Sequence, residues 1–519
     1  MKLSPSQSYV SEIQNFLSGS HLRDYLRYDE HGDLWINKLR VKDAVAKYGT
    51  PLEIHDMGIM KQRAVYWREK IREIAKDVEY TGDFALFYAS KANMALSYVL
   101  NAYREGWLAE TSSAQDLVHI LQLHQKGLIG YGLPIICNGF KFPVLSQVSD
   151  QDNASTGITF VNDGQATVPL PYLYAEYIVK LFKLGFHIMP ILDAGEVEYF
   201  AEQIDNGTMD VGLRMKFGIV HDDEHLARGV SRHGMSWDEI SEVARVVDKA
   251  ENLQLKMLHM MVSAAEVVPI DELVMSLLYG AEKYFELKKQ YPSLQYLNVG
   301  GGIPPLASGY DYDVYLQRLL SGINRMAVEY GCEAPIVVFE FGSFLTDESG
   351  FLVHRVLQRK HNSVSDNEGD LRWAIVDGGL MAELPDMFIT KKKFPVLAGN
   401  NGNETSSRYV LGDLTCDSDG RYPSKNAEEK FVVLPDADDQ LVVFACVGAY
   451  QKMLGGAGGA HHCGLLNPGQ LILEEEDGEI LARYIPPQTE EEYAASLGYG
   501  ELAHTSVQPR KAWWKFFVR

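Results

Sequence analysis

Between about Pro51 and Phe344, short apolar runs alternate with longer amphipathic segments. The run FALFYAS (residues 84–90) predicts a buried strand, and MALSYVLNAYREG after it has the spacing of a helix. The same alternation continues with GLIGYGLPIICNG, FHIMPILDAG, LQLKMLHMMVSA, LQYLNVGGGIP and PIVVFEFGSF. Apolar strands separated by helices are typical of a parallel sheet that is covered on both faces. Several such units in about 290 residues suit a closed (β/α)8 barrel at least as well as an open sheet.

After about Leu345 the pattern changes to short strands with turn residues between them. The runs FLVHRVLQRKH, RWAIVDGG, SRYVLGDLT, FVVLPD and QLVVFACVGAY have little helix between them, which predicts an antiparallel β domain. A chain of 519 residues suits two or three domains. We therefore expect an N-terminal segment (1–50) that partly joins the β domain, a barrel (51–345) and a C-terminal β domain (346–519).

Composition excludes several classes of protein. Apolar residues make up 46%, charged residues 23% and aromatic residues 11%, which excludes a disordered or collagen-like chain. The 48 Lys and Arg residues against 70 Asp and Glu residues give a net charge of −22. Such a surface repels phosphate backbones and anionic lipids, so we expect no nucleic-acid or membrane partner. It would attract a small cationic molecule.

The five cysteines are scattered and include no CxxC pair, which argues against a disulfide framework and a structural zinc site. The N-terminus lacks the apolar core of a signal peptide, and no apolar run is long enough to span a membrane. These features predict a soluble, cytoplasmic protein. His461, His462 and Cys463 are adjacent, and adjacent residues rarely ligate one ion, so we predict no metal. The aromatic tail KAWWKFFVR is expected to pack against a dimer partner.

Three strand ends carry candidate chemistry. Lys91 follows the strand FALFYAS, where a barrel would deliver it, partly desolvated, to the catalytic mouth as an amine that forms a Schiff base. Gly300–Gly302 follow another strand and could cradle a phosphate, and Glu340 ends a third. Taken singly, each has an ordinary explanation: a solvated lysine, a tight turn and a solvated carboxylate. Together they indicate an aldehyde cofactor with a phosphate, pyridoxal phosphate.

Longer motifs support this interpretation. They are YASKAN, IICNGFK, LPDMF followed by FPV, DLTCDSDG and VGAYQKMLG. On these motifs the chain resembles the pyridoxal-phosphate decarboxylases of the alanine-racemase-like fold, which act on ornithine, diaminopimelate or arginine. The strongest likeness is to the biosynthetic arginine decarboxylases, and it extends from about Pro51 to Pro468.

The resemblance implies roles for individual residues. Lys91 would bind the cofactor covalently, and Cys416 would return a proton to the substrate carbon. The other residues implied in cofactor binding are Glu110, Arg214, Gly300, Gly301, Gly302, Glu340 and Tyr450. Asp417 would bind the distal cation of the substrate, and Asp377 would match another substrate-binding aspartate. Apart from the resemblance, Asp417 and Asp419 form an acidic cluster beside Cys416 that could hold a cationic substrate or be a solvated turn. In this family Cys416 and Asp417 come from the neighbouring subunit, which implies a homodimer with shared active sites.

Three positions depart from the family pattern. Met261 and Ala264 stand where the family has the histidine that stacks on the ring and a serine that binds the phosphate. Ser343 stands where the family has an arginine that pairs with the phosphate. His259 lies two residues before the histidine position, and Arg214 or Lys216 could replace the missing arginine.

The expected function is α-decarboxylation of a basic amino acid, with arginine, giving agmatine for polyamine biosynthesis, as first choice. Two alternatives stay open. One is a decarboxylase or racemase for another amino-acid-derived intermediate, since a fold does not fix a function. The other is a non-catalytic regulatory homologue, which would tolerate the lost cofactor contacts.

Overall fold

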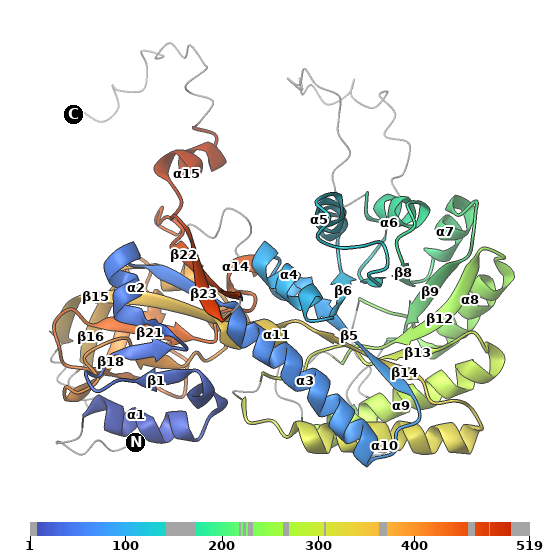
Figure 1. The fold of residues 1–519 in the computed structure, drawn as a ribbon, viewed down its shortest axis with the longest axis horizontal. Helices are drawn as coiled ribbons and strands as arrows, with labels where there is room; N and C mark the ends of the chain where they lie inside the picture. Colours follow the sequence, from blue (N-terminus) through green and yellow to red (C-terminus); the bar gives the residue numbers. More distant parts are fainter. Residues whose placement is uncertain are drawn as a thin grey trace, which may run out of the picture. The chain divides into compact units, whose positions relative to one another are not determined.

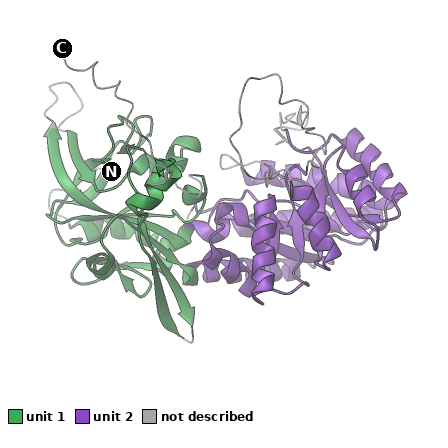
Figure 2. Cartoon of the chain, turned by 90° about the horizontal axis from the view of Figure 1, so that it is seen from above, with its two compact units in different colours: residues 1–58, 348–519 green, residues 59–347 purple. Residues whose placement is uncertain are grey.

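The structure is a computed structural model of the 519-residue chain. It describes residues 8–141, 173–216, 220–221, 225–226, 232–262, 269–305, 308–362, 371–454, 462–476 and 478–499. The chain divides into two compact units (Figure 2). One contains residues 59–347, and the other contains residues 1–58 together with residues 348–519.

The first of these units is a closed barrel of eight parallel strands, which confirms the predicted (β/α)8 fold. Its strands are β5 (Asp83–Ala89), β6 (Leu108–Thr111), β7 (Ile135–Cys137), β8 (Ile188–Leu192), β9 (Met209–Arg214), β12 (Leu253–His259), β13 (Tyr296–Asn298) and β14 (Ile336–Phe341). β14 pairs with β5 and closes the ring.

Helices lie around these strands (Figure 1). They are α3 (Met57–Asp77), α4 (Leu96–Arg104), α5 (Ala114–Gln125), α6 (Tyr174–Lys183), α7 (Val197–Gln203), α8 (Trp237–Lys249), α9 (Ile270–Gln290) and α10 (Tyr312–Tyr330). Local sequence sets several of their ends. Ser236 and Glu239 form a reciprocal cap at the start of α8, and Gly331 ends α10 with a φ of 63°. In the described residues no helix combines the length and apolar character needed to cross a membrane.

The interior of the barrel is filled by apolar side chains from several strands. They are Phe87, Ile136, Met189, Ile191, Met257 and Val338. This interior explains why the strands are apolar on both faces, since helices cover the outside and side chains fill the centre. Because all strands are parallel, their carboxyl ends meet at one mouth of the barrel.

The other unit contains a ten-stranded sheet that is mostly antiparallel. Its strands are β4 (Leu52–Asp56), β15 (Gly350–Asn362), β16 (Leu371–Val376), β17 (Val396–Ala398), β18 (Ser406–Gly412), β19 (Arg421–Tyr422), β20 (Val432–Pro435), β21 (Leu441–Ala445), β22 (Gly469–Glu476) and β23 (Glu479–Ile485). Only the pairs β16–β18 and β4–β22 are parallel among the described strands of this sheet.

The N-terminal residues belong to this β unit, as expected for segment 1–50, but the strand that enters its large sheet lies just beyond that segment. Residues 26–40 form a separate three-stranded sheet of β1 (Leu26–Tyr28), β2 (Leu34–Ile36) and β3 (Leu39–Arg40). β4 instead pairs with β15 and β22. The predicted barrel (51–345) includes residues 52–56, but the structure puts them in the β unit because both partners of β4 come from the C-terminal half of the chain.

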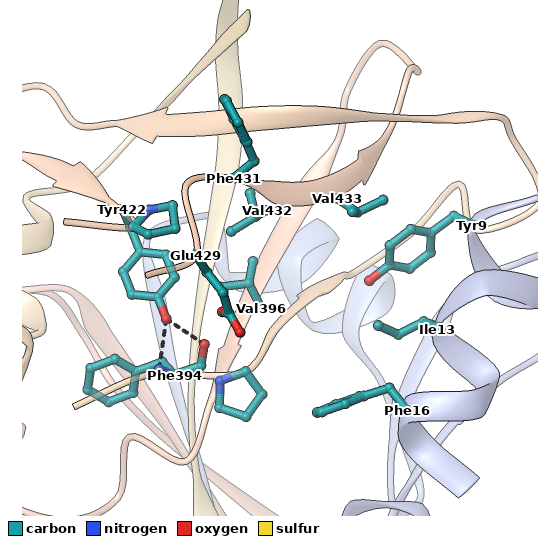
Figure 3. A pocket seen from close by; sticks show the side chains of 12 residues that line it. Tyr9, Ile13, Phe16, Phe394, Val396, Tyr422, Glu429, Phe431, Val432 and Val433 are labelled. Atoms are coloured by element: carbon teal, nitrogen blue, oxygen red, sulfur yellow. Dashed lines mark hydrogen bonds between the residues drawn. The ribbon is translucent and has the colours of Figure 1, made fainter. Parts of the chain in front are cut away.

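An apolar hollow of about 320 Å³ also lies in the β unit (Figure 3). Tyr9, Ile13 and Phe16 of α1 (Tyr9–Ser18) line it together with Phe394, Tyr422 and residues 431–433. The Tyr422 hydroxyl donates to the Phe394 carbonyl at 2.7 Å. None of the site residues predicted from the sequence lines this hollow.

His354 is a buried ionisable group at the centre of the β unit. Its Nδ1 lies 3.3 Å from Asp377 Oδ1, and its Nε2 lies 3.1 Å from Glu383 Oε2. Burial alone would lower the pKa of His354, but the facing carboxylates of Glu383 and Asp377 raise it to about 9. The histidine therefore carries a positive charge at neutral pH.

We predict that the β unit loses stability as the pH rises from about 6.5 to about 9. The folded protein holds the His354 proton more tightly than the unfolded chain, so this stabilisation is complete below about pH 6.5 and disappears above pH 9. Its full size is on the order of 3 kcal/mol for a shift of this extent. The melting temperature should fall as the pH rises across this range, and it should depend less on pH in H354Q. H361Q, an exposed position on the same strand, is the control; an unchanged slope in H354Q would contradict the prediction.

Candidate active site

Polar side chains gather at the mouth of the barrel. Each comes from the carboxyl end of a strand or from the residues directly after it. They are Lys91 after β5, Glu110 on β6, Asn138 after β7, Arg214 on β9, His259 on β12, Asn298 on β13 and Glu340 on β14. The parallel register brings them together, since His259 pairs with both Arg214 and Asn298 across neighbouring strands.

Glu340 is the centre of this group. Its side chain is 4% exposed, and the amides of two asparagines hold its two oxygens. Asn298 Nδ2 donates to Oε1 at 2.6 Å, and Asn138 Nδ2 donates to Oε2 at 2.9 Å. His259 Nε2 lies 3.7 Å from Oε2, too far for a hydrogen bond, and burial lowers the pKa of His259.

The two buried carboxyl groups at the mouth differ in pKa. Burial opposes ionisation of Glu340, but His259, the Lys91 charge and the Asn298 amide lower its pKa to about 2. Burial raises the pKa of Glu110, and the nearby Glu340 carboxylate raises it further against the effect of Lys91. Glu340 is therefore the member of the pair that carries a permanent negative charge.

Glu110 is linked to Glu340 through Asn138. Asn138 Nδ2 donates to Glu110 Oε1 at 2.8 Å, and the Ser112 hydroxyl donates to the same oxygen at 2.8 Å. Glu110 Oε2, Asn138 Oδ1 and both ring nitrogens of His259 are buried and have no hydrogen-bond partner among the described residues. Buried polar atoms normally form hydrogen bonds. The mouth of the barrel therefore offers hydrogen-bonding groups to a polar ligand.

Lys91 lies in the single turn η2 (Ser90–Ala92) that follows β5. Its charge acts on both Glu110 and Glu340, which locates its ammonium group at the mouth. In this single chain Lys91 is exposed to solvent, so the partial desolvation expected from the sequence is wrong here.

The glycine loop is packed tightly against its neighbours. A Cβ on Gly301 would lie 2.0 Å from the Glu340 carbonyl oxygen, and one on Gly300 would lie 2.5 Å from Met261 Sδ. The Gly300 N–H donates to Asn298 Oδ1 at 2.8 Å, and the Gly301 N–H donates to Met261 Sδ at 3.3 Å. The loop therefore needs these glycines for its own packing, and two of its N–H groups are already engaged.

Met261, Ala264 and Ser343 are the positions that depart from the family pattern. Met261 packs on the glycine loop, and Ser343 begins the short helix α11 (Ser343–Thr346). Ala264 lies outside the described residues. Burial lowers the pKa of Arg214, while the charges of Glu340 and Asp193 favour its charged form. Lys216 is exposed.

In the β unit, the motif DLTCDSDG forms a closed turn after β18. Asp413 Oδ1 accepts hydrogen bonds from the Thr415 N–H and hydroxyl, at 2.9 and 2.6 Å. Its other oxygen accepts from the Leu380 N–H at 2.9 Å. A Cβ on Gly420 would lie 2.3 Å from Asp413 Oδ1, so the last residue of the motif must be small.

This turn presents the predicted proton donor and substrate acids. Cys416 is exposed. Asp417 Oδ2 lies 3.0 Å from His462 Nε2, and the Asp419 N–H and His462 lower the pKa of Asp417. Asp419 is exposed and pairs with Lys425 Nζ at 2.9 Å. Asp417 is thus ionised and half-exposed, whereas Asp419 already forms an ion pair with Lys425.

Asp377 and Tyr450 have structural partners. Asp377 accepts hydrogen bonds from Thr50 and from the Arg355 N–H and faces His354. The Leu414 N–H donates to the Gly378 carbonyl at 3.0 Å, so Asp377 also adjoins the DLTCDSDG turn. Tyr450 precedes α14 (Gln451–Leu454) with a φ of 66°.

The two asparagines that hold Glu340 are not among the site residues predicted from the sequence. Asn138 and Asn298 both stand where an apolar strand ends, within the motifs IICNGFK and NVGGGIPP. A polar residue directly at the end of an apolar strand is the sequence signal that could have identified both asparagines as site residues. No group of three His, Cys, Asp or Glu side chains suited to a metal ion occurs in the described part of the chain, and His461 lies outside it.

No model of a known protein family matches the chain, but curated proteins do. It is 23% identical over 399 residues to the biosynthetic arginine decarboxylase of Trichlorobacter lovleyi, covering 71% of this chain and 57% of that protein. It is 21% identical over 442 residues to the diaminopimelate decarboxylase of Bacillus methanolicus, covering 82% and 89%. The chain thus spans about half the length of the arginine decarboxylases that it matches.

A solved structure shares the whole fold. The biosynthetic arginine decarboxylase of Campylobacter jejuni superposes with a TM-score of 0.74 at 16% sequence identity, over 98% of this chain and 96% of that one. Both the barrel and the β domain are therefore common to the two proteins. In sequence the chain is similar to arginine and diaminopimelate decarboxylases, and in fold it is similar to the solved structure of an arginine decarboxylase.

Proposed function

We propose that the protein is a pyridoxal-phosphate-dependent α-decarboxylase of a basic amino acid, with arginine as the first-choice substrate. The supporting observation is the buried, ionised Glu340 at the mouth of the barrel, with the charge of Lys91 beside it. A carboxylate that stays ionised can hold a proton on a ring nitrogen, and a lysine amine is the group that binds an aldehyde cofactor.

The residues at the mouth fit this cofactor. The buried atoms of Glu110, Asn138 and His259 that lack hydrogen-bond partners suit a ligand with polar groups around an apolar ring. Gly302, with a φ of 89°, and the guanidinium of Arg214 would hold the phosphate, since the N–H groups of Gly300 and Gly301 are engaged within the loop.

When bound, pyridoxal phosphate supplies an electron sink for the electron pair that remains on the α-carbon as carbon dioxide leaves. Lys91 would hold the cofactor through its amine and release it to the substrate amino group. Glu340 would keep the ring nitrogen protonated, and its bonds from Asn138 and Asn298 fix its orientation beforehand.

The β unit would supply the remaining groups. The hydrogen bond and charge of Cys463 raise the pKa of Cys416, so Cys416 remains a thiol that can give its proton to the α-carbon. Ionised Asp417 would pair with the guanidinium of the substrate. We further propose that Cys416 and Asp417 complete the barrel site of a neighbouring subunit, so that the active form is a homodimer.

A second candidate is the decarboxylation of diaminopimelate. The relative with that name aligns over 89% of its own length. In addition, Lys425 lies beside the DLTCDSDG turn and could face a distal carboxylate. The choice between the two substrates depends on whether Asp417 or Lys425 meets the distal end of the substrate.

Replacement of Lys91 tests the cofactor. The purified protein should show a visible absorbance band of bound pyridoxal, and borohydride should fix pyridoxal to the peptide that contains Lys91. K91A should carry no covalently fixed pyridoxal, because Lys91 is the only amine proposed to bind the aldehyde. K126A, an exposed lysine next to α5, should retain it. Pyridoxal fixed to a different lysine would refute the assignment.

Mixing two inactive variants tests the shared site. K91A lacks the amine of the barrel, and C416A lacks the thiol of the β unit. A mixed dimer has one composite site with both groups, so about a quarter of the activity should return after refolding together, if subunits combine at random. Mass spectrometry must verify the mixed dimers, and their inactivity would count against a site shared between subunits.

Replacement of Asp417, with a comparison of four substrates, tests which charge the site accepts at the distal end of the substrate. Release of carbon dioxide from arginine, lysine, ornithine and diaminopimelate should favour arginine. D417N should raise the KM for arginine about tenfold or more, since one charge pair is lost. D419N should have a smaller effect because Lys425 accompanies Asp419, and D438N, an exposed position elsewhere in the β unit, should have none. Equal or better turnover of diaminopimelate would instead support the second candidate.

A further inference from the structure

Two exposed cysteines face each other in the β unit. Cys416 Sγ and Cys463 Sγ lie 3.4 Å apart, although 47 residues separate them in the chain. The Cys416 N–H also points at Cys463 Sγ, at 3.4 Å. Of the other three cysteines, Cys137 and Cys446 are buried, and Cys332 is half-buried.

A histidine and an aspartate extend this pair. His462 Nδ1 lies 3.5 Å from Cys463 Sγ, and His462 Nε2 lies 3.0 Å from Asp417 Oδ2. When Nε2 carries the ring hydrogen and donates it to Asp417, the lone pair of Nδ1 faces the Cys463 thiol. The order thiol, imidazole and carboxylate is the arrangement that activates a cysteine as a nucleophile.

We infer that Cys416 and Cys463 form a reversible intramolecular disulfide, with Cys463 as the attacking thiol and Cys416 as the resolving thiol. A disulfide bond is about 2.05 Å long, so the two sulphur atoms need to approach by only about 1.3 Å. Cys416 remains protonated in the reduced pair, which leaves Cys463 as the thiol that His462 can deprotonate.

The oxidant is a hydroperoxide, and the reaction has two steps. His462 Nδ1 takes the thiol proton of Cys463, and the thiolate sulphur attacks a peroxide oxygen. The O–O bond breaks, Cys463 becomes a sulfenic acid, and the leaving oxygen takes the proton from His462 Nδ1; with hydrogen peroxide this gives a first molecule of water. Cys416 sulphur then attacks Cys463 sulphur, the S–O bond breaks, and the thiol proton of Cys416 leaves with the hydroxyl group as water. In total, two thiols lose two electrons and two protons, and the peroxide is reduced.

The disulfide would also control catalysis, and this part rests on the proposed function. Cys416 is there the group that returns a proton to the substrate carbon, and a disulfide sulphur has no proton to give. Oxidation should therefore stop turnover without removing the cofactor from the barrel, because none of the proposed cofactor residues at the mouth of the barrel takes part in the disulfide.

The test uses the full-length protein, reduced and then treated with hydrogen peroxide. Intact mass spectrometry should show the loss of two hydrogen atoms, and peptide mapping should identify one linked peptide pair that contains Cys416 and Cys463. Dithiothreitol should reverse the change. C463S should abolish the linked pair, whereas C332S, a half-buried cysteine in the barrel unit, should retain it. H462Q should slow its formation about tenfold or more, the usual contribution of a positioned base being 10²–10⁴.

The results separate this inference from the proposed function. Failure to detect the linked pair in the wild-type protein, or its persistence in C463S, would overturn the inference whatever the activity. If the linked pair forms and arginine turnover stops while the pyridoxal absorbance stays, both hold. If the linked pair forms but turnover continues, the disulfide stands and the role of Cys416 as proton donor fails.

Discussion

The burial of one carboxylate organises the mouth of the barrel. Glu340 is almost fully enclosed, and an enclosed charge is stable only when hydrogen bonds and opposite charges replace the water it has lost. Asn298 from β13, Asn138 after β7 and Lys91 after β5 provide this replacement. Because these groups come from different strands, the ionised Glu340 requires the complete barrel.

The same network determines which groups are left over for a ligand. Asn138 uses both of its amide hydrogens on the two glutamates, so its carbonyl oxygen is left without a partner. The Gly300 N–H is used by Asn298 and the Gly301 N–H by Met261. Fewer N–H groups are therefore left for a phosphate than a run of three glycines suggests, and the proposed phosphate site would depend on Gly302 and on the charge of Arg214.

The β unit contains a comparable arrangement on a smaller scale. Asp413 closes the DLTCDSDG turn by accepting three hydrogen bonds, and this closure holds Cys416 and Asp417 on its exposed side. His462 contacts both Asp417 and Cys463. Asp417, the proposed partner of a cationic substrate, and the proposed disulfide pair thus contact the same histidine, which would link substrate binding to the redox state of the thiols.

The sequence by itself determined the parallel α/β unit, the β domain and the strand ends that carry Lys91, Gly300–Gly302 and Glu340. These follow from local patterns, because an apolar run and the residue that ends it are neighbours in the chain. Tertiary structure alone decided that β4 joins the β unit, since its partners β15 and β22 lie hundreds of residues away. It also decided that Asn138 meets Glu340 and that Cys416 meets Cys463. Contacts between distant segments depend on the register of strands and the path of turns, which no local pattern records.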